Sequence, residues 1–282
     1  MFEVVAADSI APSVHRLTVR APRVAKARKP GQFVIVRADE GAERVPLTIA
    51  DADVEAGTIT LIVQALGVST KQIVAIPVGQ RIRDVAGPLG KATEIRNFGT
   101  VACIGGGVGT AVLFPLAKAL AEAGNRVYTI IGARSGPFVI LRDELAEFCT
   151  DVRVTTEDGS MGTKGFVTTE LQALLADQTA RPGAVFAVGP VPMMKAVAEM
   201  TRPEGIETVV SLNPIMVDGT GMCGGCRVTV GDEIKFACVD GPEFDGHAVD
   251  FDELAARQRT YEDHECKLDA ALATPAGEEN NE

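Results

Sequence analysis

Residues 100–124, TVACIGGGVGTAVLFPLAKALAEAG, decide the fold that this chain is expected to adopt. The stretch opens with an apolar run typical of a buried strand, passes through a glycine-rich turn, and continues with helical periodicity up to Gly124. Segments with these two textures keep alternating to about residue 210. Because strands that alternate with helices form parallel sheets, we predict an α/β doubly wound domain over residues 98–210.

The glycine turn at residues 105–109 is a candidate binding site for the pyrophosphate of a dinucleotide. Gly105 and Gly107 match the pattern G-x-G-x-x-G, but Thr110 stands where the last glycine is expected. A helix start without bulky side chains binds phosphate through its backbone N–H groups and its dipole. The alternative is a tight turn with no ligand, and the strand–turn–helix context favours the dinucleotide.

Two further candidates follow predicted strands, at the edge where open α/β sheets bind ligands. Gly189 comes directly after the strand at residues 184–188. Asp158 lies in a long connection after another strand, where its carboxylate could bind a ribose hydroxyl or be a solvated turn residue.

Residues 1–97 have a different texture, with short β-rich runs separated by turn residues. This pattern predicts a small antiparallel barrel with one short helix after Gly67. Arg44 offers a planar fork of donors that suits a pyrophosphate, and Gly67, Ser69 and Thr70 offer backbone and hydroxyl donors. From the residues alone this is only a possible anion site.

The cysteines indicate a metal centre, because three of the six fall within sixteen residues. Asp218, Cys223, Cys226 and Cys238 match the plant-type [2Fe–2S] spacing C-x4-C-x2-C…C, with aspartate in the first position. A structural zinc site is the alternative, although zinc ribbons have two close cysteine pairs and Cys238 has no partner nearer than Cys266. Cys266 also competes with Asp218 for the fourth position.

The composition excludes several classes of function. Of the 282 residues, 46% are hydrophobic and 23% are charged, which is ordinary for a globular protein. A net charge of −11 argues against binding to nucleic acid or to an anionic membrane surface. No apolar run reaches the ~20 residues of a membrane span, and the start MFEVVAADSI lacks a secretory pattern, so we expect a cytoplasmic location.

We therefore expect four parts, with no internal repeat. They are a β-barrel over residues 1–97, the α/β domain over 98–210, a small cluster-binding domain over 211–266, and a flexible acidic tail over 267–282.

In combination, these motifs resemble those of a known superfamily. The order of R-x-P-L-T at Arg44–Thr48, the glycine turn, GPVPMMK after residue 188, and the cysteine cluster is similar to the ferredoxin–NADP reductase superfamily. Within it, the chain resembles the iron–sulfur flavoprotein branch, over residues 1 to about 265. That branch includes the electron-transfer subunit of dihydroorotate dehydrogenase and the small subunit of an electron-bifurcating transhydrogenase, the NADH-dependent ferredoxin:NADP⁺ oxidoreductase.

The resemblance implies roles for individual residues. The barrel would bind FAD, with Thr48 near the isoalloxazine as the catalytic position. The implied FAD ligands are Arg44, Pro46, Leu47, Thr48, Gly67, Ser69 and Thr70. The implied NAD(H) ligands are Gly105, Gly106, Gly107, Gly109, Ala133, Arg134, Asp158 and Gly189, and the implied cluster ligands are Asp218, Cys223, Cys226 and Cys238.

Aspartate in the first cluster position favours the transhydrogenase small subunits over the dihydroorotate dehydrogenase subunits, which carry cysteine there. The implied function is an oxidoreductase subunit that passes electrons between NAD(H), FAD and a [2Fe–2S] cluster. The implied partner is a larger iron–sulfur flavoprotein subunit with a second FAD, [4Fe–4S] clusters and NADP(H), through which ferredoxin takes part indirectly. Arg134 would suit NADP, whereas the resemblance favours NAD(H).

Two other functions stay open. The first alternative is the electron-transfer subunit of a dihydroorotate or sulfide dehydrogenase. The second is a non-catalytic redox-sensing or zinc-stabilised module.

Asp218→Cys tests the first cluster position. Ligand type and net charge tune the potential of an iron–sulfur cluster, so we expect a shifted midpoint potential in a redox titration. An unchanged midpoint potential would contradict the hypothesis that Asp218 sets the potential of the cluster.

Overall fold

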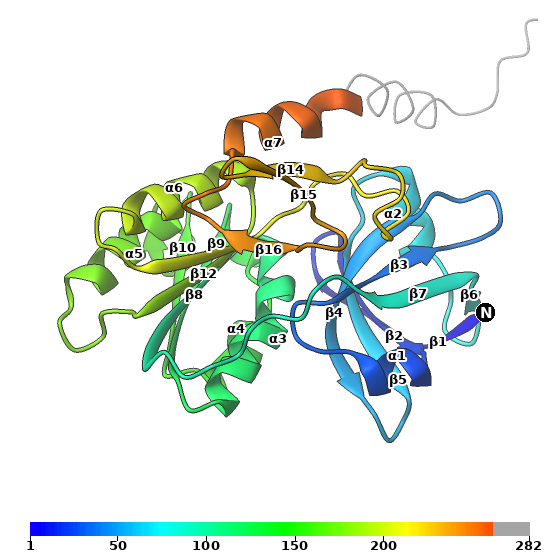
Figure 1. Ribbon diagram of the computed structural model, residues 1–282. Coiled ribbons are helices and arrows are strands. Elements are labelled where there is room, and N and C mark those ends of the chain that lie inside the picture. The colour runs from blue at the N-terminus through cyan, green and yellow to red at the C-terminus, as the bar shows by residue number, and fades with distance from the viewer. Residues whose placement is uncertain (262–282) are drawn as a thin grey trace, which may run out of the picture.

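The structure, a computed structural model, describes residues 1–261. The predicted acidic tail and Cys266 lie outside the described residues. Figure 1 shows a barrel on one side, a sheet with helices on the other, and the cysteine-rich segment lying across the top of both. Within residues 1–261, no helix has the length and apolarity needed to cross a membrane.

The first part is a nearly closed antiparallel sheet of seven strands in the order β6-β1-β2-β5-β4-β3-β7. Side chains alternate between its two faces, as in β2, where Leu17 and Val19 are buried in the barrel core and Thr18 and Arg20 are more exposed. The elements are β1 (Phe2–Ala11), β2 (Val14–Arg20), α1 (Pro22–Ala27), β3 (Phe33–Arg37), β4 (Val45–Asp53), β5 (Thr58–Gln64), α2 (Val68–Val74), β6 (Arg81–Ile82) and β7 (Asp84–Leu89). The predicted barrel and its short helix after Gly67 are confirmed.

The second part is a seven-stranded sheet in the order β11-β10-β9-β8-β12-β13-β16, with all pairs parallel except β13–β16. Its strands are β8 (Thr100–Gly106), β9 (Arg126–Ala133), β10 (Asp151–Thr156), β11 (Thr163–Lys164), β12 (Ala184–Val188), β13 (Glu207–Ser211) and β16 (Glu243–Asp245). The helical elements are α3 (Gly109–Glu122), η1 (Gly136–Phe138), α4 (Arg142–Ala146), α5 (Val167–Ala176) and α6 (Val191–Thr201). The predicted doubly wound sheet is confirmed.

The order of the parallel strands reverses between β8 and β12, which is the switch point where such sheets bind ligands. Every residue of β8 is buried, since α3 covers one face of the sheet and α5 and α6 cover the other. The core on the α3 side also includes barrel residues such as Val14 and Ile62. The barrel and the nucleotide sheet therefore share one apolar core.

The third part contains a two-stranded sheet, β14 (Arg227–Val230) and β15 (Glu233–Phe236), followed by β16, α7 (Phe251–Gln258) and η2 (Arg259–Tyr261). Sequence reasoning did not identify β16 as an edge strand of the nucleotide sheet. Three residues are too short for a hydrophobic pattern, and only pairing with β13 reveals their role.

A carboxyl group lies where the three parts meet. Glu243 on β16 accepts a hydrogen bond from the Thr93 hydroxyl at 2.8 Å, and the Thr93 N–H donates to the carbonyl of Pro30 at 3.0 Å. The Lys91 N–H donates to the carbonyl of Gly241 at 2.7 Å. Burial raises the pKa of Glu243 to about 7, although the Thr93 hydrogen bond acts in the opposite direction.

Glu243→Gln tests this junction. Between the ordinary carboxyl pKa of 4.5 and about 7, folded Glu243 keeps a proton that the unfolded chain releases, so the folded chain binds more protons. Stability conferred by the protonated carboxyl is therefore lost as pH rises through this window, by at most ~3 kcal/mol. We expect the variant to lack this component when urea unfolding is compared at pH 5 and pH 8.

The exposed Glu199→Gln variant is the matched control and should keep the wild-type pH dependence. Identical pH dependence in Glu243→Gln and in the wild type would show that Glu243 does not titrate in this range.

Candidate functional site

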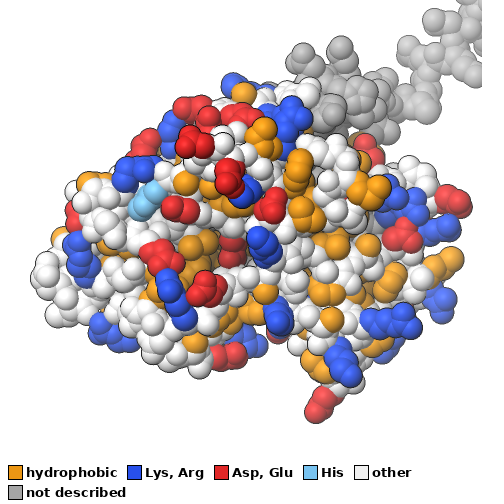
Figure 2. Space-filling view, viewed as in Figure 1, with side chains coloured by type: hydrophobic (Ala, Val, Ile, Leu, Met, Phe, Trp, Pro, Cys, Tyr) orange, Lys and Arg blue, Asp and Glu red, His pale blue; other side chains and the backbone are white. Residues whose placement is uncertain are grey.

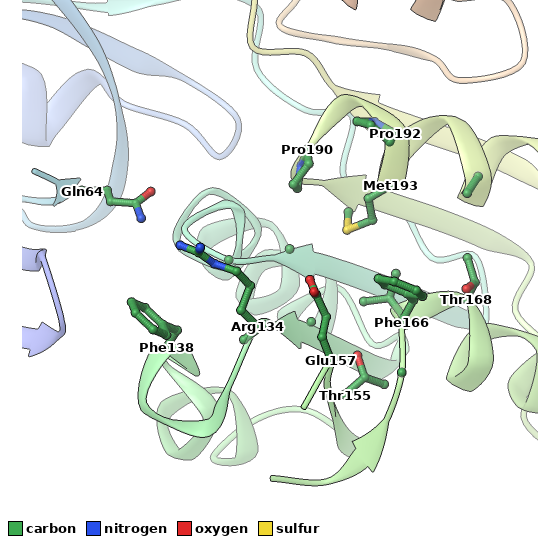
Figure 3. A pocket seen from close by; sticks show the side chains of 17 residues that line it. Gln64, Arg134, Phe138, Thr155, Glu157, Phe166, Thr168, Pro190, Pro192 and Met193 are labelled. Atoms are coloured by element: carbon green, nitrogen blue, oxygen red, sulfur yellow. The ribbon is translucent and has the colours of Figure 1, made fainter. Parts of the chain in front are cut away.

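A cavity of about 520 Å³ lies at the carboxyl ends of β8, β9 and β10 and at the start of α6. Figure 3 shows its side chains converging from these elements. Four of the predicted residues line it, namely Gly106, Gly107, Ala133 and Arg134. The predicted glycine turn and the end of the second sheet strand therefore form one cavity.

Close packing explains the glycines around the switch point. A Cβ atom on Gly106 would lie 2.5 Å from the Met193 sulfur, and one on Gly189 would lie 3.0 Å from the Cα of Gly106. A Cβ atom on Gly109 would lie 2.5 Å from the Val188 carbonyl oxygen. These glycines let two strands and two helices approach closely, and Gly189 itself does not line the cavity.

Gly107 is different, because it has a φ of +55° and open space around its Cβ position. The adjacent first turn of α3 contains the buried Thr110 hydroxyl, which has no hydrogen-bond partner within the described part of the chain. Gly105 packs directly on Thr110, so the threonine replaces the last glycine of the pattern without blocking the turn. An exposed backbone edge at a helix start fits a pyrophosphate.

Glu157, which sequence reasoning missed, lines the cavity together with Arg134. The guanidinium carbon of Arg134 lies 5.5 Å from the centre of the Phe138 ring. Asp158 is exposed, and its carboxylate accepts hydrogen bonds from the Ser160 hydroxyl at 2.6 Å and the Ser160 N–H at 2.9 Å.

The Ser160 hydrogen bonds lower the pKa of Asp158. Both residues follow the end of β10 at Thr156, in a bend where Asp158 turns toward Ser160 and Glu157 lines the cavity.

Two more lining residues were not predicted. Gln64, the last residue of β5, is the barrel's contribution to the cavity wall. Phe166, which is 65% exposed, lies at the cavity just before α5. No local motif marks either residue, because both reach the cavity only through tertiary packing.

The structure also brings together the two halves of the predicted anion site on the barrel. Glu43, next to the exposed Arg44, accepts a hydrogen bond from the Ser69 hydroxyl at 2.6 Å. The Thr70 hydroxyl donates to the carbonyl of Gly67 at 3.0 Å and so stabilises the start of α2.

A Cβ atom on Gly67 would meet nothing within 4 Å, so the backbone there is open to a ligand. Pro46 and Thr48 lie on one face of β4, whereas the Leu47 side chain belongs to the barrel core.

The cysteine-rich segment folds around its own polar groups. Asp218 accepts hydrogen bonds from the N–H groups of Thr220 at 2.6 Å and Cys223 at 2.9 Å. The N–H of Gly225 points to the sulfur of Cys223, and the N–H of Cys238 points to the sulfur of Cys226, both at 3.4 Å.

Cys226 and Cys238 are buried, and Cys223 is exposed. Burial raises the pKa of Cys238 to about 12, and the nearby Cys226 and Asp218 add to the shift.

These donors fit an iron–sulfur cluster. A cationic metal centre deprotonates and binds thiol groups, and it binds carboxylates as well. N–H groups that point to ligand sulfurs are typical of such sites. A carboxylate has about four acceptor positions, so Asp218 retains some for a metal.

Among residues 1–261, no three His, Cys, Asp or Glu side chains gather as ligands of one ion. The ligands of a [2Fe–2S] cluster are divided between two irons and need not converge on one point.

Two family models match the chain. Residues 103–199 match an oxidoreductase NAD-binding domain, and residues 213–250 match the iron–sulfur cluster binding domain of dihydroorotate dehydrogenase B. Within the first range lie the cavity's glycines, Arg134 and Glu157, and within the second lie all four predicted cluster ligands.

Known proteins match over nearly the whole chain. A Thermotoga maritima protein, a "Dihydroorotate dehydrogenase B (NAD(+)), electron transfer subunit homolog", is 48% identical over 263 residues, which cover 93% of this chain and 92% of that protein. A chain from the solved structure of the NADH-dependent reduced ferredoxin-NADP oxidoreductase, described for flavin-based electron bifurcation, has a TM-score of 0.90 and 45% identity, covering 96% of this chain and 98% of that chain.

The cytochrome b5 reductase domain of Ulva prolifera nitrate reductase shares the fold alone. It has a TM-score of 0.59 and 18% identity over 73% of this chain and 93% of that chain.

These matches confirm the predicted fold class and identify an oxidoreductase subunit. They also support the expected cofactors, which are FAD, an iron–sulfur cluster and NAD(H). The chain belongs to the family of dihydroorotate dehydrogenase B electron-transfer subunits and their homologues, within the iron–sulfur flavoprotein branch of the ferredoxin–NADP reductase superfamily.

Proposed function

We propose that this chain is the NAD(H)-binding subunit of a flavin-based electron-bifurcating NADH-dependent ferredoxin:NADP⁺ oxidoreductase. In this role it passes electrons between NAD(H), FAD and a [2Fe–2S] cluster to a partner subunit. The likeness to the bifurcating oxidoreductase, at 45% identity over 96% of the chain, supports this assignment over more distant reductases.

The observation that carries the proposal is that the barrel borders both the nucleotide cavity and the cysteine-rich segment. Gln64 of the barrel forms part of the nucleotide cavity. Phe33 and Ile35 of the barrel pack in one apolar cluster with Cys226 and Cys238. A flavin held on the barrel is therefore adjacent to both the nucleotide and the cysteines, which is the order that stepwise electron transfer requires.

Residues of the barrel would hold the FAD. Arg44 and the open backbone at Gly67 suit the pyrophosphate, with Ser69 and Thr70 at the same helix start. Pro46 and Thr48 present one face of β4 to the ring, and Leu47 contributes backbone alone. When bound, the flavin supplies the exchange between two-electron hydride chemistry and one-electron transfer.

The nucleotide cavity would hold NAD(H). The turn at Gly106 and Gly107 would bind the pyrophosphate, with Gly105, Gly109 and Gly189 as the close-packed glycines behind it. Arg134 and Glu157 would contact the adenosine ribose. A carboxylate there accepts hydrogen bonds from ribose hydroxyls and repels a 2′-phosphate, and this favours NADH.

The cysteine-rich segment would hold a [2Fe–2S] cluster through Asp218, Cys223, Cys226 and Cys238. We propose that this segment starts near residue 211 and that the nucleotide domain starts near residue 98. We place the protein in the cytoplasm, where cysteines are kept reduced for metal binding.

The cysteine-rich segment itself exposes four apolar side chains, which suit a partner surface. Val217, Met222, Ile234 and Val239 are 50%, 87%, 65% and 39% exposed. Figure 2 shows hydrophobic side chains on the face of the molecule that carries this segment. Grouped exposed apolar side chains of this kind mark interaction sites, and we propose that the larger iron–sulfur flavoprotein subunit, with its second FAD, [4Fe–4S] clusters and NADP(H), binds here.

A second candidate is the electron-transfer subunit of a dihydroorotate dehydrogenase. The 48% identical relative from Thermotoga maritima carries a name of that kind, so this function is kept as the alternative. Asp218 in place of cysteine favours the bifurcating oxidoreductase.

Reduction by NADH tests the proposal directly. The purified chain should show flavin absorption bands and an iron–sulfur shoulder, and both should bleach when NADH is added. Affinity purification from native cells should recover a larger flavoprotein subunit. A dihydroorotate dehydrogenase partner would favour the alternative, and a colourless zinc-containing protein would overturn both.

Glu157→Gln tests coenzyme choice. Removing the carboxylate should raise the ratio of kcat/KM for NADPH to that for NADH by about tenfold, or ~1.4 kcal/mol, because Arg134 then faces the 2′-phosphate without a competing charge. The ratio is measured with an artificial electron acceptor. Asp158→Asn makes the same change of charge one residue away, outside the cavity, and equal effects of the two variants would argue against a specific role for Glu157.

A further inference from the structure

The helix α7 ties the nucleotide sheet to the loop that carries Cys223 and Cys226, and Figure 1 shows it lying above α6 and β14. The side chain of Asp250 caps the helix by accepting hydrogen bonds from two N–H groups of the first turn, at 3.1 and 2.9 Å. Phe251 and Leu254 are buried in the core of the nucleotide sheet. The first half of α7 is therefore anchored on a rigid part of the fold.

The last turn of α7 holds the cysteine-rich segment at two points. The Arg257 guanidinium donates to the carbonyl of Gly225 at 3.1 Å. The Gln258 amide donates to the backbone carbonyl of Asn213 at 2.8 Å and to its side-chain oxygen at 3.0 Å. Asn213 lies near the start of the segment and Gly225 lies between two of its cysteines, so the helix holds both parts of the segment together.

The contact at Gly225 reaches the proposed cluster ligands. The N–H of Gly225 points to the sulfur of Cys223 at 3.4 Å, and its carbonyl, bound by Arg257, belongs to the peptide bond that leads into Cys226. Arg257 thus fixes the orientation of the peptide group between these two cysteines. It also places a half-buried positive charge one hydrogen bond from a turn whose ligands are anionic.

Charge near a cluster changes its potential. Reduction of a [2Fe–2S] cluster adds one electron and no compensating proton, so a nearby cation stabilises the reduced form and raises the midpoint potential. Arg257 lies outside residues 213–250, the range that matches the family's cluster-binding domain, so the family pattern does not assign it a role.

We propose that Arg257 is a positioning residue for the iron–sulfur centre, one that orients the turn between Cys223 and Cys226 and keeps the cluster easier to reduce. This proposal rests on the proposed function, because it requires the cluster. It makes α7 a link through which the nucleotide domain sets the potential of the centre.

The test compares Arg257→Met and Arg257→Lys with Arg259→Met in the full chain. Arg259, the first residue of η2, is exposed, so its replacement makes the same change of charge without the contact to Gly225. Iron and acid-labile sulfide are first measured per chain, and the cluster is then titrated with dithionite and redox mediators while its reduced form is followed by electron paramagnetic resonance.

We expect Arg257→Met to lower the ratio of reduced to oxidised cluster about tenfold at a fixed ambient potential, which corresponds to ~59 mV for a one-electron couple. Arg257→Lys should recover most of this loss, and Arg259→Met should match the wild type. A midpoint potential in fully loaded Arg257→Met equal to that of Arg259→Met overturns the inference.

If Arg257→Met does not retain iron, Arg257→Gln is compared with Arg257→Lys. A lower midpoint potential for glutamine supports the proposal, and equal potentials overturn it. Absence of iron from the wild-type chain would instead contradict the proposed function, so the two failures are distinguishable.

Discussion

Gly106 ends β8 and Gly189 directly follows β12, and the close approach of their backbones is the constraint on which the site depends. A side chain on either glycine would meet Met193 or the opposite backbone. β8 is buried along its whole length, so it cannot shift to accommodate a larger residue. The open turn at Gly107, the cavity and the start of α6 all follow from this packing.

The barrel packs against both of the other parts of the molecule. Its residues enter the core on the α3 side of the nucleotide sheet, and a different set, Phe33 and Ile35, packs against the buried cysteines. β16 adds the cysteine-rich part to the edge of the nucleotide sheet. The three parts are therefore joined by strand pairing and common apolar cores, and this arrangement holds both the cavity and the cysteines at fixed positions beside the barrel.

Charge has a different role in each part of the site. At the cysteines, backbone N–H groups point to Asp218 and to the sulfur of Cys223, and Arg257 binds the Gly225 carbonyl nearby. In the cavity, Arg134 and Glu157 present opposite charges to the same space. At the junction of the three parts, burial raises the pKa of Glu243 to about 7. The charged and titratable groups that the site and the junction depend on therefore lie in three places, each with different neighbouring groups.

Local patterns in the sequence determined the barrel and the doubly wound sheet and predicted the cysteine ligands, because each depends on residues close together in the chain. Strand alternation, helical periodicity and the spacing of Asp218, Cys223 and Cys226 are properties of short segments. The glycine turn was recognisable for the same reason, even though Thr110 breaks its pattern.

Only the tertiary structure decided which side chains share a space. Glu157 rather than Asp158 lines the cavity because the bend after β10 turns Asp158 toward Ser160. Gln64 reaches the cavity, and Arg257 reaches Gly225, from elements that are distant in sequence. Such contacts depend on how separate elements pack, and the hydrophobic pattern that drives packing carries no information about the polar groups that it brings together.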